Sequence, residues 1–377
     1  MIESPGLLLT VVAFLAIIGP LVFVHEFGHY IVGRWCGVKA EAFSIGFGKE
    51  LFAWVDKRGT RWRVAMLPLG GYVKFKGDMN AASQADPTWL EMSAQDRAES
   101  FPAKPVWQRA AIVFAGPAVN FLAAVLLLGG LAYVQGDPEA PPVVGTVAAG
   151  SAAQSAGLKP GDRIVRIMGR SIDSFTDISS IVTLRPNELL AYEIERDGRR
   201  LDLSIAAGTR IEKDRFGNVF RLGQLGVGSA PLVFRPVSLI EAPVVGARKV
   251  AQLFTSALDG LGQIVTGRRS LTELGGPLKI ADVSGQAATM GWASFIFLMA
   301  FISINLGFIN LLPIPMLDGG HLLFYAIEGI KGRPVSPQVQ EMAYRSGLMV
   351  LLTLMVFVTF NDLSSFGLWR SLSGLIG

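Results

Sequence analysis

The feature that most constrains this chain is a set of four long apolar runs. They lie near residues 7–31, 109–134, 292–313 and 347–361. A helix needs about 20 predominantly apolar residues to cross the hydrocarbon core of a bilayer, and runs of this kind supply them. Hydrophobic residues make up 51% of the chain, charged residues only 17%, and the mean hydropathy is +0.44. The sequence therefore predicts a polytopic α-helical membrane protein with about four transmembrane helices.

The basic residues indicate a sidedness in the membrane. The net charge is +4, but segment 34–109 holds twelve Lys or Arg and segment 331–345 holds three, whereas 135–152 holds none. Cytoplasmic loops of membrane proteins are enriched in Lys and Arg. We therefore expect the two basic loops to face the cytoplasm, both termini to lie on the other side, the lipid bilayer to be a partner, and nucleic acid not to be one.

The segments outside the runs have patterns of their own. Residues 41–78 alternate apolar and polar side chains, which predicts a small membrane-associated β region between two spans of the first core segment, 1–134. Residues 142–230 are long enough for a separate core. Residues 236–270 predict a one-sided helix that lies on the outer membrane surface or packs on the preceding domain. The second core segment covers 271–377.

The segment "AGLKPGDRIVRIMG", residues 156–169, resembles the signature of a bacterial PDZ domain. A hairpin with Asp197 and Gly198 as its two-residue turn follows. The resemblance implies an inserted PDZ-like α+β domain that captures extended peptide by strand addition. The alternative is a β-rich spacer or lid without a ligand. The charge asymmetry predicts that this domain lies outside the cytoplasm.

Two of the three histidines lie in "VFVHEFGHYIVG", residues 22–33, near the end of the first apolar run. On a helix, His25 and His29 project from one face one turn apart, and Glu26 lies where it can act as a general base. Ionisable groups in a span are costly unless they pair or bind something. The HExxH pattern therefore predicts a zinc site and disfavours polar groups that merely bond to neighbouring helices.

A catalytic zinc usually takes three protein ligands, so a third ligand must come from elsewhere in the chain. The third apolar run ends in "INLLPIPMLDGGH", which supplies Asp318 and His321. Pro313 and Pro315 end regular helix there and allow the backbone to turn toward a site. Sequence spacing alone does not choose between Asp318 and His321.

These motifs together resemble the site-2 protease family of intramembrane zinc metalloproteases. The resemblance rests on HEFGH in a first span, "GPAVNF" in a second and "NLLPIPMLDGGH" at the end of a third. The inserted domain, with "SIGFG", "LPLGGYVKF" and "GGPLKIA", is similar to the bacterial regulator of sigma-E branch, here with one PDZ domain where other members carry two. The resemblance implies one Zn²⁺ per chain held by His25, His29 and Asp318, with Glu26 catalytic and His321 structural.

The resemblance also implies residues that bind substrate. Asn310 matches a family Asn that holds substrate near the metal, and Asn120 matches a motif Asn with either a substrate role or an inter-helix hydrogen bond. A helical substrate must be opened before hydrolysis, and an exposed edge strand can hold the opened form. The hairpin around residues 63–75 is the candidate edge, the alternative being a β ornament on the membrane surface. Its expected contact residues are Gly70, Gly71 and Val73.

The expected enzyme is a site-2-type zinc metalloendopeptidase of the bacterial inner membrane, with its active site toward the cytoplasm. Its expected substrate is a single-span membrane protein already trimmed outside: an anti-sigma factor of an envelope-stress pathway or, as an alternative, a remnant signal peptide. A non-catalytic PDZ adaptor with a structural metal is disfavoured because the chain has one cysteine and so no thiolate cluster. A metal transporter is disfavoured because the second and fourth runs carry no ionisable groups in their apolar stretches.

Overall fold

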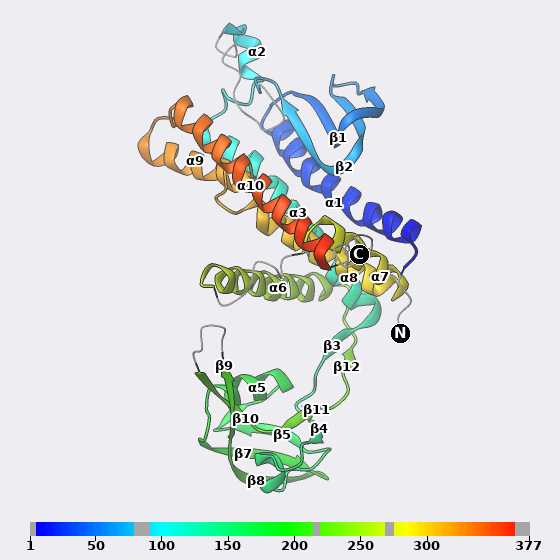
Figure 1. Cartoon of the computed structure of the whole chain (residues 1–377), viewed down its shortest axis with the longest axis vertical. Helices are drawn as coiled ribbons and strands as arrows, with labels where there is room; N and C mark the ends of the chain where they lie inside the picture. Colours follow the sequence, from blue (N-terminus) through cyan, green and yellow to red (C-terminus); the bar gives the residue numbers. More distant parts are fainter. Residues whose placement is uncertain (1–4, 79–90, 214–218, 268–274, 366–377) are drawn as a thin grey trace, which may run out of the picture. The chain divides into compact units, whose positions relative to one another are not determined.

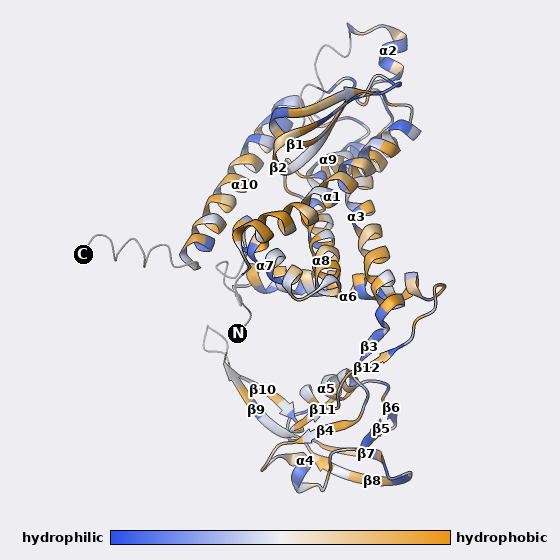
Figure 2. Cartoon of the chain, turned by 90° about the vertical axis from the view of Figure 1, so that its right-hand side faces the viewer, coloured by the Kyte–Doolittle hydropathy of each residue, from blue (hydrophilic) through white to orange (hydrophobic). Residues whose placement is uncertain are grey.

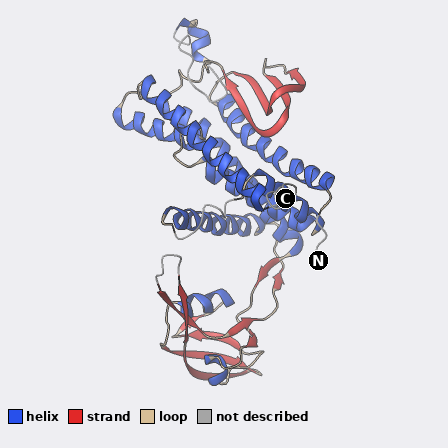
Figure 3. Cartoon of the chain, in the orientation of Figure 1, coloured by secondary structure: helices blue, strands red, loops and turns tan. Residues whose placement is uncertain are grey.

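The structure of the chain, a computed structural model, describes residues 5–78, 91–213, 219–267 and 275–365. The chain divides into two compact units, one mainly of helices and one mainly of strands (Figures 1 and 3). The membrane unit comprises residues 1–131, 243–264 and 269–377, and the inserted unit comprises residues 132–242 and 265–268.

Four helices in the described part of the chain are long and apolar enough to cross a membrane. They are α1 (Leu7–Trp35), α3 (Val106–Gln135), α8 (Trp292–Asn310) and α10 (Pro337–Ser365). The shortest, α8, has 19 residues and spans about 29 Å, close to the thickness of the hydrocarbon core. Figure 2 shows hydrophobic residues over most of α3 and α10. The expected polytopic helical membrane fold is confirmed.

Small residues let the spanning helices approach one another closely. Gly28 of α1 lies against α3, where an added Cβ atom would come within 2.6 Å of the Ala115 carbonyl oxygen. Gly307 of α8 lies against Pro117 and Phe121 of α3, and a Cβ atom there would lie 3.2 Å from each. Helices in a bilayer associate through such close packing, because lipid is as apolar as the helix interface. Helix α3 therefore packs against both α1 and α8.

The expected β region consists of two long antiparallel strands, β1 (Ala40–Val55) and β2 (Arg61–Phe75). Bulges bend the strands so that Phe43 lies opposite both Trp62 and Val73. The strands thus form a curled sheet in which residues 71–74 of β2 are one edge. Phe43 and Val73 are buried in one cluster with Tyr30 of α1, which holds this edge beside that helix.

Four further helices complete the described part of the membrane unit. They are α2 (Ala94–Ala98), α6 (Ala242–Val265), α7 (Pro277–Thr289) and α9 (Asp318–Lys331). Helix α6 is the one-sided helix expected between residues 236 and 270. Its Gly246 touches the α3 backbone at Val125, and its Phe254 packs edge-on against Phe121 and Phe308. Its apolar side therefore packs on α3 and α8, a location that the sequence did not indicate.

The start of α7 is held by a residue far away in the sequence. The buried carboxylate of Asp362, near the end of α10, accepts hydrogen bonds from the backbone N–H groups of Gly276 (3.0 Å) and Lys279 (3.1 Å). The first N–H groups of a helix have no partner within the helix, so this contact defines where α7 begins. Helix α7 was not predicted because the group that starts it is not local.

The inserted unit is a small α+β domain. Its elements are β3 (Asp137–Glu139), β4 (Val144–Val147), α4 (Ala152–Ser155), β5 (Arg163–Ile167), β6 (Arg170–Ser171), α5 (Phe175–Thr183), β7 (Leu189–Arg196), β8 (Arg199–Ala206), β9 (Gly208–Lys213), β10 (Val219–Gln224), β11 (Val227–Ser229) and β12 (Val233–Arg235). The largest sheet has the order β6-β5-β7-β8. Strand β3 pairs with β12 and β4 with β11, so the two ends of the unit are joined.

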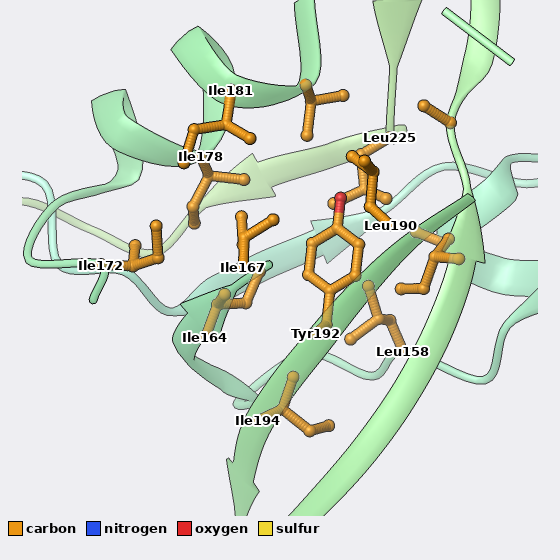
Figure 4. Close-up of a cluster of buried hydrophobic side chains, with 14 of the residues drawn as sticks. Leu158, Ile164, Ile167, Ile172, Ile178, Ile181, Leu190, Tyr192, Ile194 and Leu225 are labelled. Atoms are coloured by element: carbon orange, nitrogen blue, oxygen red, sulfur yellow. The ribbon is translucent and has the colours of Figure 1, made fainter. Parts of the chain in front are cut away.

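The core of the inserted unit contains side chains of β5, β7 and α5 (Figure 4). Alternate residues of β7 are buried, namely Leu190, Tyr192 and Ile194, as expected for a strand with one face toward a core. At the end of β7, Asp197 and Gly198 have φ values of 51° and 73°. Positive φ at both central residues is what a two-residue hairpin turn requires, as the sequence predicted.

Candidate metal centre and catalytic cavity

His25 and His29 lie one turn apart on one face of α1. Their Nε2 atoms are 3.3 Å apart, and their side chains are only 10% and 12% exposed. The Nδ1 atom of His29 lies 2.9 Å from the carbonyl oxygen of Ile112 on α3. A carbonyl oxygen only accepts hydrogen bonds, so Nδ1 of His29 carries the proton. The lone pair of His29 is therefore on Nε2, the atom that faces His25.

Asp318, the first residue of α9, lies beside both histidines. Its Oδ2 atom is 3.2 Å from His25 Nε2 and 3.5 Å from His29 Nε2. Of the two residues that the sequence left open as third ligand, it is Asp318 that reaches the pair. The Nδ1 atom of His321 lies instead 3.1 Å from the hydroxyl of Tyr344 on α10.

A tight turn between α8 and α9 brings Asp318 to this position. Met316 has a φ of 84°, a left-handed conformation that is uncommon for any residue except glycine. A Cβ atom on Gly320 would lie 2.5 Å from the carbonyl oxygen of Ile314, and one on Gly319 would overlap the carbonyl oxygen of Leu312. The turn can fold back on itself only because residues 319 and 320 have no side chain.

The three residues fit a divalent metal ion. One ligand atom from each of His25, His29 and Asp318 lies within 4.8 Å of the other two. Oδ2 of Asp318 is buried, and among the residues that the structure describes its polar contacts are the Nε2 atoms of the same two histidines, at 3.2 and 3.5 Å. A buried carboxylate oxygen in that state is costly unless a cation occupies the space beside it. Two imidazole nitrogens and one carboxylate oxygen are also the protein ligands of many catalytic zinc sites.

Glu26 lies next to this group and is held by strand β2. Its carboxylate lies beside the backbone N–H of Val73. The strand runs so close that a Cβ atom on Gly71 would lie 2.8 Å from Glu26 Cγ and 2.6 Å from the carbonyl oxygen of Ser44. The edge of the sheet and the HExxH helix therefore form one wall of the site.

A cavity of about 370 Å³ opens beside these groups. It is bounded by α1, the β1–β2 sheet, the end of α8 and the turn that precedes α9. Its lining includes His25, Glu26, His29, Phe47, Gly70, Gly71, Tyr72, Val73, Leu306, Asn310, Met316, Asp318 and His321. The cavity thus combines ionisable groups, backbone of an edge strand and apolar side chains, as ligand-binding cavities do.

The structure brings together nearly all the site residues that the sequence predicted. Asn120 does not line the cavity but is fully buried on α3, where its Nδ2 atom lies 3.0 Å from His25 Nδ1. Phe47, Tyr72 and Met316 line the cavity and were not predicted. The glycines that flank Phe47 in "SIGFG" were a usable signal, since both have positive φ. No local signal marked Met316, because its conformation is set by the turn.

Comparison with known proteins identifies the family. The sequence model of peptidase family M50 matches residues 13–354. The chain belongs to peptidase family M50. This match confirms the resemblance to the site-2 protease family, which was drawn from HEFGH, "GPAVNF" and "NLLPIPMLDGGH". The chain is therefore a membrane metalloprotease.

Curated relatives of this M50 chain match nearly its whole length. A protein of Agrobacterium fabrum with the provisional name zinc metalloprotease is 46% identical over 360 residues, 94% of this chain and 96% of the relative. The metalloprotease MmpA of Caulobacter vibrioides is 38% identical over 394 residues, 98% and 99% of the two chains. Among solved structures, a PDZ domain of a SdrC-like protein from Listeria monocytogenes matches 24% of this chain and 88% of its own, at 15% identity and a TM-score of 0.20.

Proposed function

We propose that this chain is an intramembrane zinc metalloprotease that cuts a peptide bond within or near the transmembrane segment of a single-span membrane protein. One observation carries the proposal: His25, His29 and Asp318 converge beside Glu26 in a cavity. Both histidines lie on α1, a helix apolar enough to span the membrane. Family membership and the names of the relatives support the same chemistry.

His25, His29 and Asp318 would hold one Zn²⁺ per chain. When bound, the zinc acts as a Lewis acid that activates water and polarises the peptide carbonyl. The chain's own residues orient the ligands: the Ile112 carbonyl holds the ring of His29, and the turn through Met316 holds Asp318. A ligand set fixed in this way needs little rearrangement during the reaction.

Glu26 acts as the general base. It takes a proton from water as the water oxygen bonds to the substrate carbonyl carbon, and it gives that proton to the amine when the carbon–nitrogen bond breaks. The backbone N–H of Val73 lies beside the Glu26 carboxylate, and both residues line the cavity. The base is thus positioned by the same strand that borders the substrate.

The edge of β2 is the proposed binding surface for the opened substrate. Backbone groups of alternate residues in a strand point to the same side. The N–H of Val73 points to Glu26, and the N–H of Phe75 points to Asp78. The backbone groups of alternate residues 71, 73 and 75 therefore face away from β1. An extended peptide can pair with such an edge. Gly70 and the side chain of Asn310 line the same cavity and complete the proposed substrate contacts.

The proposed substrate is a single-span protein already trimmed outside the cytoplasm, either an anti-sigma factor or a remnant signal peptide. The Lys and Arg content of segment 34–109 supports a cytoplasmic position for the β1–β2 sheet in the bacterial inner membrane. The termini and the inserted unit then lie on the opposite side. We assign the inserted unit a PDZ-like role in excluding intact ectodomains from the membrane unit.

The test is cleavage of a fluorescent single-span substrate by the purified full chain in detergent. The unmodified chain is compared with Glu26→Gln, with a chelated sample, and with the same sample after zinc is added back. We expect Glu26→Gln to lower the rate at least about 10²-fold while zinc content stays the same. Glu341→Gln, an exposed change on α10, is the matched control. A Glu26→Gln chain that cuts at the normal rate, or an unmodified chain that holds zinc and never cuts, contradicts the proposal.

A further inference from the structure

Asn120 lies behind the proposed metal ligands, on the far side of His25 from Asp318. It is fully buried on α3, and its Nδ2 atom lies 3.0 Å from His25 Nδ1. Its Oδ1 atom is also buried and has no hydrogen-bond partner among the described residues. A buried amide oxygen without a donor is unusual and requires an explanation.

One face of α3 serves both histidines. Ile112, Gly116 and Asn120 are each four residues apart on this helix, the same spacing as His25 and His29 on α1. The Ile112 carbonyl accepts a hydrogen bond from Nδ1 of His29. Gly116 leaves room for the His29 ring, because any Cβ atom at position 116 would overlap that ring. Asn120 is the group on this face that meets Nδ1 of His25.

A metal ion determines which hydrogen bond Asn120 must make. If His25 binds the metal through Nε2, its neutral ring carries the proton on Nδ1. An N–H group of Asn120 facing that proton would then be a second donor, and no hydrogen bond would form. A half turn of the amide exchanges Nδ2 and Oδ1 without changing the shape of the side chain. The oxygen then accepts from the Nδ1 proton, and the number of bonds between amide and ring is unchanged.

We propose that Asn120 is a positioning residue: its Oδ1 accepts a hydrogen bond from His25 Nδ1 and thereby keeps the His25 Nε2 lone pair directed at the zinc. This inference rests on the proposed function and replaces a direct substrate contact as the role of Asn120. The structure places Asn120 Nδ2 3.0 Å from His25 Nδ1, and the proposed arrangement differs from it only by a half turn of the amide.

The surroundings hold Asn120 in place for this task. Its backbone carbonyl accepts a hydrogen bond from the hydroxyl of Ser303 on α8 at 2.8 Å. Its side chain has no exposed surface, so the amide can rotate about its own bond but cannot swing away from His25. A partner so constrained fixes the orientation of a ligand, as groups behind metal-binding histidines commonly do.

The experiment measures zinc affinity by chelator competition on the purified full chain in detergent. Three changes at position 120 separate the possible roles. Asn120→Leu keeps the approximate volume but cannot hydrogen-bond, and we expect it to lower zinc affinity by about 10- to 100-fold. Asn120→Asp can accept but has no N–H, and we expect its affinity to stay close to that of the unmodified chain. Asn120→Ala should weaken binding as Leu does.

Ser303→Ala is the matched control for helix packing. It removes the hydrogen bond to the Asn120 backbone without touching His25, and we expect it to leave zinc affinity unchanged. Cobalt absorption spectra of the same variants add a readout of ligand geometry that does not depend on turnover. We expect Asn120→Leu to alter the cobalt spectrum and Asn120→Asp to retain it.

Three outcomes overturn the inference. The first is an Asn120→Leu chain that binds zinc normally but has a raised KM for the substrate, which would place Asn120 in contact with the substrate. The second is a folded Asn120→Asp chain that binds zinc as weakly as Asn120→Leu, which would mean that the N–H and not the oxygen is needed. The third is an unmodified chain that binds no zinc, which would overturn the proposed metal site together with this inference. The first two outcomes leave the proposed function standing.

Discussion

A Cβ atom on Gly71 would lie 2.8 Å from Cγ of Glu26, so the edge of the sheet is in direct contact with the proposed general base. The next-but-one residue of the strand, Val73, has its backbone N–H beside the same carboxylate. Strand β2 therefore has two proposed roles, since it borders the substrate and orients Glu26. A change in this strand should affect catalysis without removing the metal.

Gly71→Ala tests this relationship. The added methyl group would meet Glu26 on one side and the Ser44 carbonyl oxygen at 2.6 Å on the other, so Glu26 must move. We expect the cleavage rate to fall by about 10²-fold, a typical loss for a displaced general base, with zinc content unchanged. Gly130→Ala is the control, because a Cβ atom there meets no described atom within 4 Å. Normal cleavage by Gly71→Ala would mean that strand β2 does not hold Glu26 in its catalytic position.

Gly319→Ala tests how the turn positions Asp318. A Cβ atom on Gly319 would overlap the carbonyl oxygens of Leu311 and Leu312, so the start of α9 and Asp318 with it must shift. We expect zinc affinity to fall at least about tenfold, as for other changes that disturb a ligand's support. Gly329→Ala lies on the same helix where no described atom is within 4 Å, and it should bind zinc normally. Equal affinity in both variants would contradict the prediction.

The inserted unit should lose stability in acid through Asp162. Burial raises the pKa of this carboxyl, but hydrogen bonds from Arg196 and from the Lys159 backbone outweigh burial and hold the pKa below its ordinary value. Arg196 donates two hydrogen bonds to Asp162, from Nε to Oδ1 at 2.6 Å and from Nη2 to Oδ2 at 2.7 Å. A group with a lowered pKa in the folded state stabilises the fold above its unfolded pKa of about 3.9 and loses this contribution as the pH falls further.

Hydrogen exchange of β5 and β7 in the full chain, corrected for intrinsic rates between pH 3 and 7, measures this effect. We expect Asp162→Asn to cost about 2 kcal/mol at neutral pH, because a hydrogen-bonded charge is removed from a buried position. The same variant should lose less stability in acid than the unmodified chain. Asp202→Asn, an exposed change on β8, is the control and should behave like the unmodified chain. Identical acid profiles for all three chains would rule out Asp162 as the cause.

Tyr192→Phe should stabilise the inserted unit. The Tyr192 ring is buried in the core, and its hydroxyl has no hydrogen-bond partner among the described residues (Figure 4). Removing an unpaired buried hydroxyl avoids a desolvation cost of about 1 kcal/mol or more. Burial also raises the pKa of Tyr192 to about 12. A raised folded-state pKa means that stability is lost as the pH rises from about 10 toward 12, and Tyr192→Phe should abolish that loss.

Hydrogen exchange at neutral pH and a denaturation series at alkaline pH check both parts of this prediction. Ile194→Val, which removes one buried methylene from the same strand, should destabilise by about 1 kcal/mol and shows that the assay detects a change of this size. A Tyr192→Phe chain that is less stable than the unmodified one would mean that the hydroxyl has a partner, such as an ordered water.

The elements that sequence reasoning identified are those whose cause is local. The spans follow from continuous apolar runs, because no other structure satisfies the backbone inside a bilayer. The HExxH pair follows from helix periodicity, and the hairpin at Asp197 and Gly198 follows from turn chemistry. Helices α7 and α9 were not predicted because their starts depend on non-local structure. The distant residue Asp362 binds the first N–H groups of α7, and the turn through Met316 precedes α9.

The sequence by itself therefore determined a polytopic membrane metalloprotease with a HExxH helix and an inserted α+β unit. Only the tertiary structure decided which distant residues meet that helix. Asp318, rather than His321, reaches the two histidines because glycine packing and a left-handed residue turn the chain, and neither effect has a periodicity that can be read from sequence. Asn120 meets His25 because α3 crosses α1 at a glycine contact, and the site is completed by contacts between residues almost 300 positions apart.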